Sequence, residues 1–313
     1  MSDLSYPQAI IMGAIQGISE LFPVSSLAHS ILIPAVIGGS WAKNMSVATP
    51  ESPYLAFIVG LHVATALALL LFFRREWISI IGGFVTSIRS RSITTGPQRT
   101  AWLLVVGTIP IGIAGLLLEH TFRTVFGQPQ VTAAFLTLNG IVLFAGDRFR
   151  RRAIAKGQAP DAASVELDRT AAPAAQGEGE GSGTSAVSRL GYRRGTAVGA
   201  TQILALLPGI SRSGIAILGG MAAGLSHREA ARFSFLLATP VILAAGVLKL
   251  PDLFGPLGAG IQGQVIAGSV ASFVCALVAV AFLDRYFRTR TLTPFALYCV
   301  AAGILSFLWL TLH

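Results

Sequence analysis

The sequence predicts an all-α polytopic membrane protein with six transmembrane helices and two re-entrant helical hairpins in an inverted-topology repeat. Three observations support this prediction: the composition, six long apolar runs, and two apolar segments interrupted by similar polar motifs. Of the 313 residues, 53% are hydrophobic and 12% are charged. A soluble domain carries about twice that charged fraction. The composition therefore places the chain among membrane proteins.

Six apolar runs approach the roughly 20 residues that a helix needs to cross a bilayer. They are predicted near residues 54–73, 100–118, 131–147, 229–248, 262–283 and 293–312. Cys275 and Cys299 both fall within these runs, so they predict neither a disulfide framework nor a metal site. A cleavable signal peptide is not expected, because Asp3 stands where a basic region would be.

Residues 7–40 and 195–225 are also apolar, but proline, glycine and serine interrupt both segments. Residues 13–16 and 199–202 both read Gly-Ala-x-Gln, and each copy leads through a hydrophobic stretch to a proline and two serines. Proline removes a backbone donor and breaks a helix. We therefore expect two helical hairpins rather than two poor full spans. The prediction is a single membrane domain, 1–313, with repeat halves 1–147 and 195–313.

The arginines indicate the orientation of the chain. They cluster between the first two predicted spans, after the third span and between the last two spans, which places these connections in the cytoplasm. This distribution also argues that the net charge of +9 serves membrane topology rather than nucleic-acid binding. Both termini are then external, and the hairpins enter from opposite faces with a site near the midplane. Residues 153–194, rich in Ala, Gly and Glu, are predicted to be a disordered cytoplasmic linker.

The first interrupted segment carries candidate catalytic residues. Gln16 and Glu20 share one helical face, Ser25 and Ser26 follow on the turn, and His29 begins the return helix. A charge inside hydrocarbon costs roughly 2.5–3.5 kcal/mol on insertion scales, so it is normally retained for function. The alternative is that the serines only cap the next helix and that the histidine is a structural core residue.

The second interrupted segment has the composition of a phosphate clamp. Residues 208–214 read Pro-Gly-Ile-Ser-Arg-Ser-Gly, in which Gly209 lets the backbone approach a ligand and Ser211 and Ser213 offer hydroxyl groups. Arg212 adds a guanidinium that fits phosphate with two parallel hydrogen bonds, and the following helix presents its N-terminus. Alternatively, Arg212 only pairs with Glu20 to join the hairpins, and both roles are compatible without a ligand.

These two motifs resemble the signatures of the undecaprenyl-diphosphatase family, the bacitracin-resistance proteins of bacterial inner membranes. The resemblance covers most of the chain and leaves 153–194 as an insertion. Three departures from the family pattern stand out. Gln16 replaces an acidic residue, Leu27-Ala28 replaces the commoner Thr-Gly, and Ala216 replaces a threonine. The loss of one carboxylate and one hydroxyl puts a metal ligand and a phosphate contact in doubt.

The resemblance implies hydrolysis of undecaprenyl diphosphate to undecaprenyl phosphate and inorganic phosphate, which recycles the lipid carrier for peptidoglycan synthesis. It implies a bacterial plasma-membrane location, a site open to the external face, lipid as the partner and, as a further expectation, a homodimer. Glu20 would bind Mg²⁺ or Ca²⁺ together with Gln16, or act as a general base. Ser26 would be the nucleophile with His29 as its base or as the leaving-group acid, unless water attacks directly. The diphosphate would be held by Ser25, Gly209, Ser211, Arg212 and Ser213.

The main alternative is a lipid flippase or secondary transporter, since inverted repeats and broken helices are typical of transporters. The grouping of Glu20, Ser26 and His29 favours chemistry, because a carrier needs no nucleophile. The absence of a P-loop and of a zinc-protease motif disfavours ATP-driven transport and zinc hydrolysis. An ion channel is disfavoured, because the sequence shows no ring of repeated charges. His62, within the first predicted span, is interpreted as a core histidine.

Overall fold

Six long apolar helices form the frame of the molecule. The computed structural model describes residues 4–45, 53–157, 187–249 and 260–313, together with residues 253, 255 and 258. All regular elements within these residues are helical. Six helices are long and apolar enough to cross a membrane, which confirms the six predicted spans. They are α4 (Pro53–Phe72), α6 (Gly96–Phe126), α7 (Pro129–Ala155), α12 (His227–Lys249), α14 (Gln262–Tyr286) and α15 (Thr293–Leu312).

The two interrupted segments each form two short helices joined by a turn. The first contains α1 (Tyr6–Ser19) and α2 (Ser26–Ile37), and the second contains α10 (Tyr192–Thr201), the short 3-10 helix η1 (Gln202–Leu206) and α11 (Arg212–Ala222). Both return helices begin at a serine N-cap. The Ser25 side chain accepts a hydrogen bond from the Ala28 amide, and the Ser211 side chain accepts one from the Gly214 amide. Serine is favoured at this position because its oxygen satisfies an otherwise unpaired amide.

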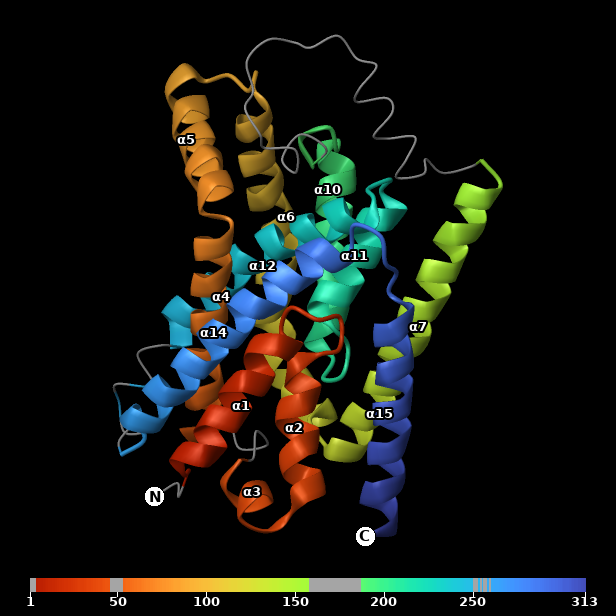
Figure 1. Cartoon of the computed structure of the whole chain (residues 1–313). Coiled ribbons are helices and arrows are strands. Elements are labelled where there is room, and N and C mark those ends of the chain that lie inside the picture. Colours follow the sequence, from red (N-terminus) through yellow and green to blue (C-terminus); the bar gives the residue numbers. More distant parts are fainter. Residues whose placement is uncertain are drawn as a thin grey trace.

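The two hairpins approach the centre of the molecule from opposite ends (Figure 1). Both chain termini lie at one end, with α3 (Gly39–Asn44), whereas α10 lies toward the other end (Figure 1). Helix α1 packs on α14, and α10 packs on α6. Helix α7 packs on α15, and α4 packs on both α12 and α14. Each hairpin therefore packs against a long helix from the other half of the chain.

Close helix contacts explain the glycines of the repeated Gly-Ala-x-Gln motif. A Cβ atom on Gly13 would overlap the backbone of Gly268 in α14, and a Cβ atom on Gly199 would overlap the backbone of Gly107 in α6. Glycine, whose side chain is a single hydrogen atom, lets these backbones approach so closely. Small residues have the same role at many helix contacts in membranes. The two motif copies thus perform the same packing role in the two halves.

We expect Gly199→Ala to lower the midpoint of thermal unfolding by several degrees in detergent micelles, because overpacking costs about 1–3 kcal/mol. The matched control is Gly112→Ala, whose added methyl group would meet no atom within 4 Å among the described residues. Alanine is the better helix former, so the control should be neutral or stabilising. Equal shifts in both variants, measured by scanning fluorimetry, would contradict the packing role of Gly199.

One connection differs from the sequence-based expectation. The arginine-rich stretch after the first span, expected to be a loop, contains helix α5 (Arg74–Ser90). Trp77, Ile80 and Phe84 recur at helical spacing; Ile80 belongs to the largest cluster of buried hydrophobic residues, and Trp77 and Phe84 pack against that cluster. Helix α5 runs beside α6 (Figure 1). The flanking arginines are typical of a membrane-protein loop, and they mask this amphipathic pattern in the sequence.

The predicted linker 153–194 is described only at its ends. Helix α7 continues to Ala155, and α10 begins at Tyr192, so both boundaries of the linker overlap with helices. Residues 158–186, which make up most of the linker, lie outside the described residues.

Candidate active site

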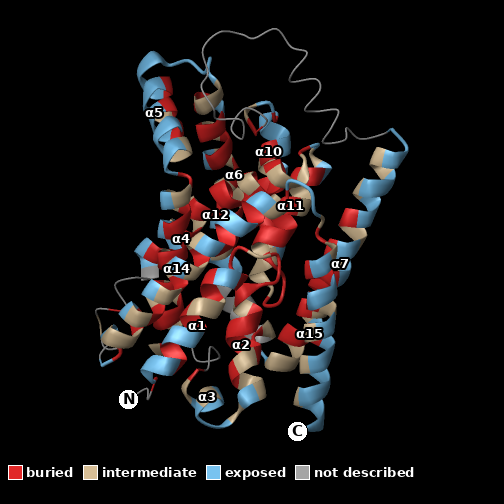
Figure 2. Cartoon of the chain, in the orientation of Figure 1, coloured by how far each residue is buried: buried red, intermediate tan, exposed pale blue. Residues whose placement is uncertain are grey.

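Buried polar side chains gather where the turns of the two hairpins meet. Gln16, Glu20, Ser26, His29 and Ser211 are all buried. The turn after α1 and much of α2 and α11 are buried, whereas α5 and the lower part of α15 are largely exposed (Figure 2). A buried charge is tolerated only with partners. The contacts of these side chains therefore define the site.

Glu20 is the centre of this cluster. Its Oε1 atom accepts a hydrogen bond from Arg212 Nη2, which belongs to the opposite hairpin. Its Oε2 atom accepts hydrogen bonds from Ser26 Oγ at 2.5 Å and Gln16 Nε2 at 3.0 Å. The structure thus joins the predicted acid, the predicted guanidinium and the predicted nucleophile. It also shows the anticipated ion pair between the hairpins.

His62, interpreted from the sequence as a core histidine, contacts the same cluster. It projects from α4, and its Nε2 atom lies 3.2 Å from Glu20 Oε2. Its Nδ1 atom lies 2.8 Å from the carbonyl oxygen of Ile58. A lone histidine within an apolar run gives no local signal of this contact, because its partner lies on another element.

His29 has different partners from those the sequence suggested. Its Nδ1 atom lies 2.8 Å from the carbonyl oxygen of Ser25, and its Nε2 atom lies 2.7 Å from the hydroxyl of Tyr298 on α15. Both ring nitrogens are engaged by these contacts. The hydroxyl of Ser26 is bonded to Glu20 instead.

The second turn is braced against its surroundings. Ser213 Oγ donates a hydrogen bond to the carbonyl oxygen of Phe22 at 3.1 Å and lies 3.0 Å from Ser211 Oγ. Gly209 has a φ of +116°, which favours glycine, and it packs directly on α7. An added Cβ atom on Gly209 would lie 2.7 Å from the backbone nitrogen of Leu136. The clamp motif is thus fixed between the first turn and α7.

Asn139 connects both turns and was missed by sequence reasoning. It is fully buried on α7. Its Nδ2 atom donates to the carbonyl oxygen of Pro23 at 3.2 Å, and its Oδ1 atom accepts from the Ser211 amide at 3.0 Å. A single amide side chain therefore sets the spacing of the two motifs. Its only signal in the sequence is a polar residue within an apolar run.

The fold and the site together define a polytopic helical membrane protein with a buried carboxylate, guanidinium and serine cluster at the junction of two hairpins. The family model described as "Bacitracin resistance protein BacA" matches residues 9–305, and the chain belongs to this family.

Relatives from bacteria match nearly the whole chain. A protein of Mycolicibacterium paratuberculosis named undecaprenyl-diphosphatase is 60% identical over 310 residues, covering 99% of each chain. A protein of Mycobacterium avium with the same name is 60% identical over 312 residues, covering 100% of this chain and 99% of the relative. A Frankia alni protein named undecaprenyl-diphosphatase 2 is 51% identical over 335 residues, covering 97% of this chain and 98% of the relative.

Proposed function

We propose that this chain is an integral membrane phosphatase that hydrolyses undecaprenyl diphosphate to undecaprenyl phosphate and inorganic phosphate. The observation that carries this proposal is the buried contact of Glu20 with both Arg212 and Ser26. The names of the full-length relatives support it. In a bacterial plasma membrane, this reaction returns the lipid carrier to peptidoglycan synthesis.

The turn before α11 is the proposed diphosphate clamp. Arg212 is the first residue of α11, and the free amides of a helix N-terminus favour an anion. Gly209, Ser211 and Ser213 complete the turn, and Ser25 caps the facing helix α2. An arriving diphosphate would take hydrogen bonds from Arg212 that now go to Glu20. Release of this ion pair would leave the carboxylate free to act as a base.

The geometry supports serine catalysis with Glu20 as the general base. Ser26 Oγ would attack the terminal phosphorus while its proton passes to Glu20, to which it is already bonded. The bond from this phosphorus to the bridging oxygen would break, and undecaprenyl phosphate would leave with the electron pair. Water would then cleave the phosphoserine. Direct attack by water on the substrate is the rival route, and trapping a phosphorylated Ser26 would separate the two.

The donor set fits a divalent cation that arrives with the substrate. Gln16 Oε1 is buried and has no hydrogen-bond partner among the described residues, and it belongs to the same side chain that contacts Glu20. The described part of the chain contains no cluster of three His, Cys, Asp or Glu residues suited to a metal. Mg²⁺ often binds through one or two carboxylates and substrate phosphates. Gln16 and Glu20 would hold Mg²⁺ or Ca²⁺, which would neutralise phosphate charge.

The approach of the hairpins from opposite ends supports the inverted-topology repeat and the re-entrant assignment (Figure 1). The Gly13 and Gly199 contacts with opposite halves of the chain provide the same support. In this arrangement the arginine-rich connections face the cytoplasm, and the site opens to the external face. A homodimer stays a prediction, which sedimentation in detergent would test.

Phosphate release from undecaprenyl diphosphate in detergent micelles tests the proposed function against lipid transport. Micelles have no transmembrane gradient, so a transporter would release no phosphate. We expect release by the purified chain when a divalent cation is present. Lipid movement across liposomes without phosphate release in micelles would favour the flippase alternative.

We expect Asn139→Leu to lower kcat/KM for phosphate release by about 10²-fold, because small displacements of catalytic groups have effects of this size. Both turns lose their common hydrogen-bond partner in this variant. The control is Thr108→Val on α6; among the described residues, the Thr108 hydroxyl bonds to the carbonyl oxygen of Leu104 in its own helix and to no other group. If Asn139→Leu and Thr108→Val retain the same activity, Asn139 does not align the site.

A further inference from the structure

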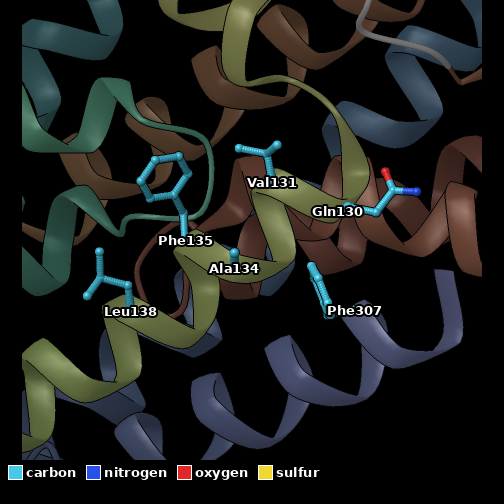
Figure 3. Close-up of a pocket in the computed structure, with 6 residues that line it drawn as sticks. All are labelled: Gln130, Val131, Ala134, Phe135, Leu138 and Phe307. Carbon is cyan, nitrogen blue, oxygen red and sulfur yellow. The ribbon is translucent and has the colours of Figure 1, made fainter. Parts of the chain in front are cut away.

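An apolar pocket lies between α7 and α15 (Figure 3). It has a volume of about 310 Å³ and is open to the surroundings of the protein. The amide of Gln130, the one polar side chain in its lining, donates to the carbonyl oxygen of Leu310. The lining residues are Gln130, Val131, Ala134, Phe135, Leu138 and Phe307. The pocket therefore suits a hydrocarbon ligand.

The pocket adjoins the candidate active site. Phe135 and Asn139 are four residues apart on α7, so they share one helical face and lie about one 5.4 Å turn apart. Asn139 bonds to both turns of the site. Gly209 of the clamp motif packs against the Cβ atom of Phe135. The ring of Phe135 extends from α7 toward the second hairpin (Figure 3). One side chain thus contacts the clamp and lines the pocket.

We propose that this pocket binds the isoprenoid units next to the diphosphate of the substrate. The inference rests on the proposed function and locates the lipid tail. An isoprenoid chain is apolar and branched, and it must leave the buried diphosphate along a path without charged groups. The pocket suits such a path, because Phe135 of its lining lies against Gly209 and the lining carries no charged side chain. Phe135 and Phe307 offer aromatic surface from α7 and α15.

Filling the pocket tests this assignment. Ala134→Trp places a large side chain in the pocket from an exposed position on α7. Ala301→Trp is the matched control, because Ala301 is also an exposed alanine, lies on α15 and is not part of the lining. We expect Ala134→Trp to raise the KM for undecaprenyl diphosphate about 10-fold, as the contact area with the tail is lost. The kcat should be retained, and Ala301→Trp should match the wild type.

Inorganic diphosphate provides a probe of the head group alone. Its inhibition constant should be the same for the wild type and for Ala134→Trp, because it has no tail to displace. Phe307→Ala, which removes one wall of the pocket, should also raise the KM without changing this constant. Equal KM values for Ala134→Trp and Ala301→Trp in an active enzyme would overturn the tail assignment. Absence of phosphate release by the wild type would instead refute the proposed function.

Discussion

Replacing Arg212 with alanine is expected to lower kcat/KM for phosphate release by about 10³-fold. Arginine residues that stabilise transferring phosphoryl groups contribute 10³-fold or more in other phosphoryl-transfer enzymes. Arg212 is the cation that the structure places against Glu20 at the start of α11. Its removal would take away both the clamp on the diphosphate and the positive charge beside the general base.

Arg212→Lys separates charge from shape. Lysine retains a positive charge but cannot form two parallel hydrogen bonds with phosphate. We expect an activity between those of the wild type and Arg212→Ala, with phosphate release measured at saturating and limiting substrate. The midpoint of thermal unfolding of each variant shows whether loss of the ion pair with Glu20 has also lowered the stability of the protein. Near-normal turnover by folded Arg212→Ala would show that this residue does not hold the diphosphate.

Glu20→Gln is expected to lower kcat by at least about 10²-fold, which is the usual contribution of a general base. Glutamine keeps the shape of the side chain but cannot take the Ser26 proton. The assay is run at saturating divalent cation, because Glu20 is also a proposed ligand of that cation, and Arg212 stays available for the diphosphate in this variant.

Glu76→Gln is the control for Glu20→Gln. The Oε1 atom of Glu76 lies 3.9 Å from Nη1 of Arg232, and Glu76 is not part of the Glu20 cluster. Its replacement should therefore leave kcat unchanged. Initial rates of phosphate release, measured over a range of substrate concentrations, give kcat and KM. The base assignment fails if Glu20→Gln turns over as fast as Glu76→Gln.

Local patterns in the sequence predicted much of the fold and one part of the site. The spans follow from run length, and the structure confirms all six of them. The contact between Gln16 and Glu20 follows from their four-residue spacing on one helix. Of the two similar motifs, one carries an acidic residue and the other a basic residue. This difference also predicted the ion pair between Glu20 and Arg212, although 192 positions separate them.

The remaining site residues have no local pattern. His62, Asn139 and Tyr298 are single polar residues within apolar helices, and each reaches the site only through packing between helices. The hydrogen bond between His29 and Tyr298 joins residues 269 positions apart. Spacing along one helix cannot reveal such contacts. For the same reason the sequence left open whether Glu20 or His29 acts as the base; the hydrogen bond from Ser26 to Glu20 favours Glu20, and the assignment stays a proposal.

The most direct test of the account is an experimental structure with a methylene-bridged analogue of undecaprenyl diphosphate. The methylene bridge resists hydrolysis, so the bound head group shows which side chains face each phosphorus. The account predicts that Arg212 and the turn at 209–213 contact the diphosphate, with Ser26 Oγ in line with the bridge and Glu20 beside it. A head group bound elsewhere, or Glu20 and Arg212 on separate sides of the protein, would contradict the account.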